Sequence, residues 1–383
     1  MTKNGYFRIA LTVVLAGLAA KAVPFLKSGA TYHFTDMTSE QFIVGGARSY
    51  VDGGWFTHYG LPTYEGFRTE TPIKKIQETG VYTHFLPGPD VFMGLMLTVS
   101  GDHHGTFVLA RLLILAFLLF SLARLAYALR DRVFEHQPWK AIVVITLVAL
   151  VPATYRWTMS IFGNTIWTAC VFLLIAQGLR SGPSCTDYVK SGLWGGLALF
   201  MFLEGAFVAA CAPICGALLC LEPDWRRSLA TGTRHALAAG TGMIAIFGLH
   251  FVQVALFLGS LSHAWTDQIG TALTRGEHRD GPDRWAMFEA MNAWVRGHFY
   301  IGIWAMVVLG AIAVFTQWRR GRRSPAGVLA IAAAVSAGYA FPLLLIHHTF
   351  IHSFRTPRFF MLLFIVCWTL VLTVAGTRPS KST

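Results

Sequence analysis

The chain has 383 residues, of which 54% are hydrophobic and only 13% are charged. Apolar runs of about 20 residues recur along its length, and because such runs cross a bilayer core, the composition predicts a polytopic membrane protein. The net charge of +12 does not indicate nucleic-acid binding, because the basic residues form short clusters between apolar runs, where they orient the spans. The cysteines lie in apolar runs or, for Cys185, in a basic loop, which excludes an extracellular disulfide framework.

The first apolar run follows Lys3 and Arg8 and has a small-x-small motif at 20–22, so it also fits a cleaved signal peptide. We expect a retained span over 7–26 instead, because the run is long enough to cross and would tether the next stretch to the membrane surface. That stretch begins a long, structured outer loop, 27–106.

The outer loop opens with Asp36 and Glu40, four residues apart, ahead of a helical pattern that continues to Tyr50. Like charges so close raise the pKa of one carboxyl group, as a general base near neutral pH requires. The pair also fits a structural role, since aspartate is a good N-cap and a glutamate in the first turn is favoured by the helix dipole. The spacing alone leaves both interpretations open.

The end of this loop leads into the second span. The segment 87–101 is apolar but short, and Pro87 and Pro89 favour a helix that lies at the interface or re-enters without crossing. The span 107–128 then carries Arg111 near its outer boundary, where topology does not favour positive charge. Such a guanidinium either binds a phosphate through paired hydrogen bonds or extends to the lipid headgroups.

The remaining spans complete an all-α polytopic membrane protein of about ten transmembrane helices, in a single domain over 1–383. They are expected at 139–158, 164–180, 191–205, 206–221, 236–258, 299–316, 326–346 and 358–376. Basic residues in alternate loops place both termini in the cytoplasm. The localisation that we expect is a bacterial inner membrane, with the active site facing the periplasm.

A second outer loop, 259–298, contains another helical pattern. Trp285, Phe288, Met291 and Trp294 recur there at helical spacing. An aromatic stripe of this kind is typical of a helix that lies in the membrane interface, where simple anchoring explains it.

The outer end of the last span carries a cluster of basic side chains. In "HHTFIHSFRTPRFF" these are His347, His348, His352, Arg355 and Arg358. The cluster fits a phosphate pocket or a contact with lipid headgroups. Together with "GDHHG" it could also supply zinc ligands, but adjacent histidines diverge on a regular element and no H-E-x-x-H or C-x-x-C motif is present. We therefore expect no metal and no other cofactor.

Several stretches resemble the membrane-embedded glycosyltransferases of the GT-C class, notably protein O-mannosyltransferases and lipid A aminoarabinose transferases. "SEQFIVGGARSYVDGGW" is similar to the family's helix after the first span. "YTHFLPGPDVFMGLMLTVSGDHHGTFVLARLLILAFLLFSLARLAY" is similar to its His-Pro-Pro segment, its glycine turn and its second span, which opens with arginine. "RWTMSIFGNTIW" and "RTPRFFMLLFIV" are similar to later segments.

The resemblance implies that a sugar moves, with inversion, from a polyprenyl-phosphate carrier to an acceptor on the outer face. A carboxylate in the first outer loop would act as general base, and no nucleotide takes part. Glu40 matches the second acid of the family's pair, but Ser39 stands at the first position and Asp36 lies one turn earlier. This departure leaves open which acid is the base; we expect Asp36, assisted by Glu40.

The resemblance also implies roles for basic residues. Arg111 matches the arginine that holds the carrier phosphate, and Arg355 and Arg358 are further candidates for that role. His84 matches the histidine of the His-Pro-Pro segment, although "HFLP" has one inserted position. With His348 and His352, it forms the expected substrate-binding set. The chain ends after its last span with no soluble domain, which favours a lipid-linked or glycan acceptor.

Two alternatives stay open. A transferase of the O-antigen-ligase or polymerase type would use outward arginines and a histidine without a carboxylate base. A transporter or lipid flippase would place acids and arginines along a pathway through the membrane, although no inverted repeat is apparent between the halves.

Overall fold

The computed structural model describes residues 3–26, 37–64, 73–84, 86–155, 160–180, 182–276, 284–321, 323–346, 349 and 356–375. These residues are almost entirely helical, and the β-type pairing recorded among them is an isolated bridge between Thr63 and Val81. The α-helices and 3₁₀ helices (η) are, in chain order, α1 Lys3–Leu26, α2 Met37–Gly53, α3 Lys74–Thr79, α4 Gly88–Ser100, α5 His104–Arg132, α6 Trp139–Leu150, α7 Pro152–Tyr155, α8 Asn164–Gly178, α9 Cys185–Met201, η1 Leu203–Gly205, α10 Ala206–Leu219, α11 Trp225–Leu258, α12 Leu261–Gly276, α13 Arg284–Phe299, α14 Ile303–Arg319, α15 Ala326–Leu344, η2 Thr356–Phe360 and α17 Met361–Val374.

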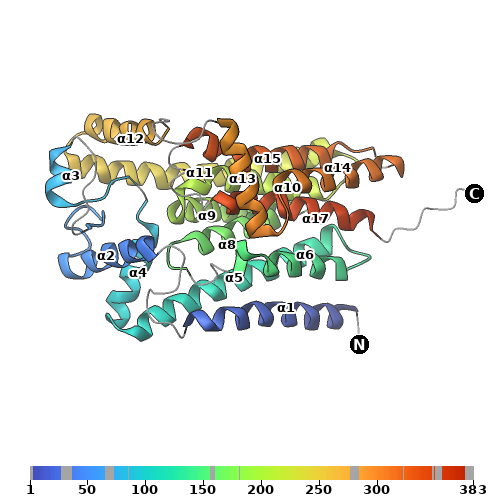
Figure 1. The fold of residues 1–383 in the computed structure, drawn as a ribbon, viewed down its shortest axis with the longest axis horizontal. Coiled ribbons are helices and arrows are strands. Elements are labelled where there is room, and N and C mark those ends of the chain that lie inside the picture. The colour runs from blue at the N-terminus through green and yellow to red at the C-terminus, as the bar shows by residue number, and fades with distance from the viewer. Residues whose placement is uncertain are drawn as a thin grey trace, which may run out of the picture.

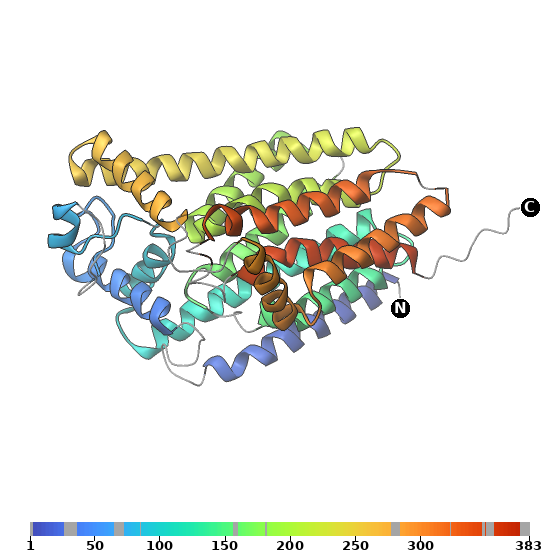
Figure 2. The ribbon, with the colours of Figure 1, turned by 45° about the horizontal axis from the view of Figure 1, so that its top comes forward.

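The long helices form an elongated bundle with two distinct ends (Figure 1). The start of α1 and the end of α17 lie at one end, whereas α2, α3, α4 and α12 gather at the opposite end (Figures 1 and 2). At the end where α1 starts and α17 ends, Arg132 Nη2 donates to Glu222 Oε1 at 2.8 Å. Lys140 Nζ donates to the carbonyl oxygen of Ala375 at 2.5 Å. The described parts of the two segments predicted to be outer loops therefore share one end, and several of the basic loops share the other.

Five helices of the described chain are long and apolar enough to cross a bilayer. They are Asn4–Val23, His104–Arg132, Trp225–Leu258, Ala326–Leu344 and Pro357–Val374. α13 and α14 make a sixth if the pair, bent by 75°, is one broken span. The all-α class is thus confirmed, and these helices indicate an integral membrane protein. Because α6, α8 and α10 are shorter, a bundle of about ten crossings would require short helices to cross as well.

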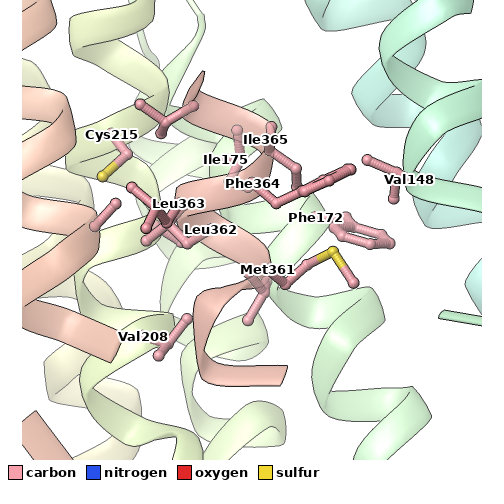
Figure 3. Close-up of a cluster of buried hydrophobic side chains, with 14 of the residues drawn as sticks. Val148, Phe172, Ile175, Val208, Cys215, Met361, Leu362, Leu363, Phe364 and Ile365 are labelled. Carbon is pink, nitrogen blue, oxygen red and sulfur yellow. The ribbon is translucent and has the colours of Figure 1, made fainter. Parts of the chain in front are cut away.

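The last helix, α17, occupies the middle of the bundle. Its side chains Met361, Phe364 and Ile365 lie among residues of α6, α8 and α10, including Val148 and Phe172 (Figure 3). A helix that is apolar on every side belongs in such an interior position. The consequence is that η2, which leads directly into α17, carries Arg358 into the protein interior.

α13 buries one face and leaves part of the predicted aromatic stripe exposed. Its buried face is formed by Met287, Met291, Val295 and Phe299, which recur every four residues and are at most 2% exposed. Trp285, a member of the predicted stripe, is 72% exposed. The helix thus docks against the bundle through a face that includes Met291 of the predicted stripe, because residues four positions apart share a helix face.

α11 joins the bundle to the end formed by α2, α3, α4 and α12. Its 34 residues correspond to a length of about 51 Å, whereas a hydrocarbon core is about 30 Å thick, so the helix is longer than one crossing requires. Near its far end, His250 Nε2 lies 2.9 Å from the carbonyl oxygen of Thr83. Gln253 Nε2 donates to the carbonyl oxygen of Tyr59 at 3.0 Å. The first outer loop is therefore held by a helix that also passes through the bundle.

α9 and α11 meet through small residues. A Cβ atom added at Gly242 of α11 would overlap the carbonyl oxygen of Gly192 in α9, and one added at Gly195 would overlap the carbonyl oxygen of Ala239. Small residues at such positions let helix backbones approach closely, which is a main source of helix association in lipid.

Replacement of Gly242 by leucine should therefore force α9 and α11 apart. We expect Gly242→Leu to lower the free energy of unfolding by about 1–3 kcal/mol, the usual effect of overpacking. Gly240→Leu is the matched control on the same helix, because a Cβ atom there would meet nothing within 4 Å. The unfolding midpoints of the two purified variants can be measured by thermal unfolding in detergent. Equal midpoints for Gly242→Leu and Gly240→Leu would show that the glycine contact does not contribute to stability.

Candidate functional site

Glu40 and Arg111 form a buried ion pair at the end of the bundle where α2 and α4 lie. Arg111 Nη2 is 3.3 Å from Glu40 Oε2, and the two side chains are 2% and 1% exposed. The residues come from α2 and from the second turn of α5, which are 71 positions apart in the sequence. The structure thus brings together two of the residues that the sequence singled out.

The other carboxylate oxygen of Glu40 is also engaged. Ser160 Oγ donates to Glu40 Oε1 at 3.2 Å, and the backbone N–H of Ile161 donates to the same oxygen at 3.1 Å. Hydrogen bonds and a cation that act together on a carboxylate favour its ionised form. This arrangement suits a residue that orients Arg111.

An apolar layer surrounds the pair. Ile43, Val44 and Ala47 lie on the same face of α2 as Glu40, because positions three, four and seven residues apart share a helix face. They pack against Met93 and Leu97 of α4 and Phe107 and Ala110 of α5. In surroundings of such low polarity, an unpaired charge would be very costly, so each partner depends on the other.

Arg358 lies deeper in the bundle. It is 1% exposed and lines a small cavity of about 10 Å³ together with Leu118, Thr154 and Asn164. Leu118 follows Arg111 by two turns of α5, so the two arginines approach this helix at points about 10 Å apart along its axis. The cavity has room for about one water molecule.

Two polar groups beside this cavity were not anticipated from the sequence. The side-chain amide of Asn164 and the hydroxyl of Thr154 are buried and have no hydrogen-bond partner among the described residues. Buried polar atoms in this state call for a water or ligand to complete their hydrogen bonds. Asn164 stands in "RWTMSIFGNTIW", a segment selected for its resemblance, but nothing in its spacing indicated that the side chain faces Arg358.

His84 belongs to a separate polar cluster with α11 and α12. Its Nε2 lies 3.2 Å from Asp267 Oδ1, and the Asp267 side chain is almost fully buried. Gln268 Nε2 donates to the carbonyl oxygen of Thr83 at 2.8 Å, which fixes the same turn. Asp267 was not predicted as a site residue. It lies 183 positions from His84, and no local sequence pattern indicates a contact over that separation.

Asp90 and Tyr64 form a further buried polar pair beside α2. Tyr64 donates its hydroxyl to Asp90 Oδ1 at 2.8 Å. A Cβ atom at Gly46 would overlap that oxygen, so glycine is required where α2 passes the pair. Burial raises the pKa of Asp90 to about 7, although the hydrogen bond from Tyr64 acts in the opposite direction.

The structure does not describe the other residues of the predicted site. Asp36, Arg355, His348 and His352 lie outside the described residues. No group of three or more His, Cys, Asp and Glu side chains within the described ranges could hold a metal ion.

The charge pair gives a first prediction for this site. Glu40→Leu should lower the free energy of unfolding by about 3–5 kcal/mol, because it leaves Arg111 buried without a counter-charge. The double variant Glu40→Leu, Arg111→Met should recover a large part of this loss, because it removes both charges from an apolar setting. Denaturation in detergent measures both.

Arg48→Gln is the matched control for this pair. It breaks the ion pair with Asp102, whose side chains are 51% and 45% exposed, and should cost less than about 1 kcal/mol. A Glu40→Leu effect no larger than that of Arg48→Gln would mean that Glu40 and Arg111 do not depend on each other.

The raised pKa of Asp90 predicts a pH dependence of stability. An unfolded aspartate titrates near pH 3.9, so between about pH 4 and 7 the folded protein binds more protons than the unfolded chain. The contribution of Asp90 to stability is therefore fully present below about pH 4 and is lost as the pH rises through about 7. Asp90→Asn should remove this part of the decline in unfolding midpoint, whereas the exposed Asp102→Asn should keep it. A decline of equal slope in all three proteins would contradict the assignment.

No family model, curated protein or solved structure matches this chain. The function of the site is therefore inferred from its residues and their geometry.

Proposed function

We propose that the protein is an inverting glycosyltransferase that moves a sugar from a polyprenyl-phosphate carrier to a lipid-linked or glycan acceptor. The observation that carries this proposal is the buried pair of Glu40 and Arg111 near the end of a helix long enough to span the membrane. A guanidinium fixed at that depth suits the phosphate of a membrane-anchored carrier, because it can form paired, charge-assisted hydrogen bonds with phosphate oxygens.

In the proposed reaction, the acceptor hydroxyl oxygen attacks the anomeric carbon from the face opposite the phosphate, which accounts for inversion. The bond between the anomeric carbon and the phosphate oxygen breaks, and its electron pair leaves with the phosphate. Arg111 stabilises the charge that develops there, with Arg358 and Arg355 as further cationic groups. No soluble nucleotide is needed, because the carrier phosphate is itself the leaving group.

The two acids have different roles in this scheme. Glu40 accepts hydrogen bonds from Ser160 and Ile161 and pairs with Arg111, so it positions the phosphate-binding arginine. Asp36, four residues earlier in the sequence, is the general base that takes the proton of the acceptor hydroxyl. His84, held by Asp267, contributes to substrate binding with His348 and His352.

The proposed setting is a bacterial inner membrane crossed about ten times, with the shorter helices α6, α8, α9 and α10 crossing beside the longer ones. The basic loops and both termini lie on the cytoplasmic side, as the distribution of arginine and lysine favours. The end of the bundle that holds Glu40 and Arg111 then faces the periplasm. Segments α4 and α12 would cover the site and limit the entry of water, which would otherwise hydrolyse the activated sugar.

A transporter or lipid flippase is the second candidate function. It is favoured by the cavity at Arg358, where Thr154 and Asn164 place buried polar groups deeper in the bundle than Arg111. Polar side chains within a membrane bundle mark the pathways of transported substrates.

Transfer of a radiolabelled sugar from a panel of polyprenyl-phosphate sugars, by the purified protein in liposomes, tests the proposal. Asp36→Asn should lower turnover by about 10²–10⁴-fold while carrier binding persists, because only proton abstraction is lost. Arg111→Lys keeps the buried charge but loses the planar fork, so it should weaken carrier binding as well. Arg48→Lys, at an exposed position of α2, is the control that should leave both unchanged.

Three outcomes would contradict the scheme in different ways. Activity that survives Asp36→Asn and Glu40→Gln but not His352→Ala would favour a ligase type of transferase. Lipid scrambling or solute uptake without sugar transfer would favour the transporter. The absence of both turnover and carrier binding across the panel would return the two acids to a structural role at the start of α2.

A further inference from the structure

A second polar cavity opens at the other end of the bundle, far from Glu40 and Arg111. It has a volume of about 350 Å³ and lies between α5, α8 and the start of α9. Three arginines line it, namely Arg124, Arg132 and Arg180, together with Gln177 and Asp187. A cavity of this size falls within the range of small-ligand sites.

Arg124 is the unusual member of this set. It lies eight residues before the end of α5, about 12 Å from that end, and because α5 is about 43 Å long this position is close to the edge of a hydrocarbon core of about 30 Å. Its side chain is exposed, and it makes no hydrogen bond or ion pair with another described residue. An arginine that lines an open cavity without a protein partner is a candidate for binding an anionic ligand.

The other charged side chains that line the cavity each have a partner of opposite charge. Arg132 donates to Glu222 and to the carbonyl oxygen of Leu179. Arg180 pairs with Asp187, and Asp131, which also lines the cavity, pairs with Arg130 at 2.6 Å. The carboxylates are thus engaged by other arginines, which leaves Arg124 as the cation that faces the open volume.

Gln177 adds an independent sign of a ligand. It is 7% exposed, and its side-chain oxygen is buried without a hydrogen-bond partner among the described residues. An acceptor in this position is satisfied by a hydroxyl group that enters the cavity. Contact with bulk lipid headgroups would account for a positive charge at Arg124. It would not account for the side-chain oxygen of Gln177, which is buried without a hydrogen-bond donor.

We infer that this cavity binds a phosphate ester that also carries hydroxyl groups, with Arg124 holding the phosphate and Gln177 accepting a hydrogen bond from a hydroxyl. The ester can come from the membrane, as a lipid headgroup of the phosphatidylglycerol type, or from solution, as a polyol phosphate. Because Arg124 lies about 20 Å along α5 from Arg111, the site does not depend on the proposed sugar transfer.

Calorimetric titration of the purified full-length protein in a neutral detergent tests this inference. The probes are dihexanoyl phosphatidylglycerol, dihexanoyl phosphatidic acid, which has the phosphate without the glycerol hydroxyls, and soluble glycerol 3-phosphate. We expect phosphatidylglycerol to bind the wild type, and Arg124→Gln to weaken that binding at least tenfold. Arg227→Gln, which removes an exposed arginine at the start of α11, should change it less than twofold.

The Gln177 variant separates a defined site from general attraction to charge. Gln177→Met should weaken phosphatidylglycerol at least fivefold and leave phosphatidic acid unchanged, because only the hydroxyl contact is lost. Binding of glycerol 3-phosphate with the same dependence on Arg124 would identify a soluble ligand, whereas binding of the lipid alone would identify a membrane headgroup. Equal losses in Arg124→Gln and Arg227→Gln, no effect of Gln177→Met, or no binding of any probe would overturn the inference.

Discussion

The arrangement of the proposed active end depends on one buried charge pair. Glu40 and Arg111 join α2 to α5, and Ser160 and Ile161 add the segment before α8 to the same carboxylate. A buried pair of this kind contributes little net stability compared with apolar side chains of the same size, since both charges lose their hydration. Its contribution to the fold is therefore to fix the relative positions of α2 and α5 and the orientation of the guanidinium.

The rest of the fold keeps that pair in place. α17 is apolar on every side and fills the centre of the bundle, so η2 delivers Arg358 to the interior beside α5. α11 extends past the bundle and holds the turn at Thr83, which positions His84 against Asp267. The polar side chains Arg358 and His84 are thus positioned by helices whose own contacts are mostly apolar.

The sequence predicted the long helices well, because their apolar length is a local property. α1, α5, α11, α15 and the helix at 357–374 each contain a window that fits a membrane by composition alone. The buried face of α13 was not predicted, because aromatic spacing does not say which side meets the bundle. The number of crossings is harder still, since the shorter helices carry too weak a signal to decide it.

Individual site residues were easier to predict than their contacts. Glu40 and Arg111 stood out by charge in apolar surroundings, but their pairing joins positions 71 residues apart. Asp267, Asn164 and Gln177 were missed, because ordinary polar residues become conspicuous only when tertiary packing buries them. Such contacts follow from the whole fold and have no local pattern.

The glycine contact between α9 and α11 has a mechanical consequence. Gly242 lies near the middle of α11, and close backbone packing there holds the helix while its two ends reach opposite faces of the molecule. A second close approach occurs at Gly232, where an added Cβ atom would lie 2.8 Å from Ile214 Cα of α10. α11 is therefore gripped at more than one point of its length, and a bulky substitution at either glycine would disturb a helix that contacts both ends of the molecule.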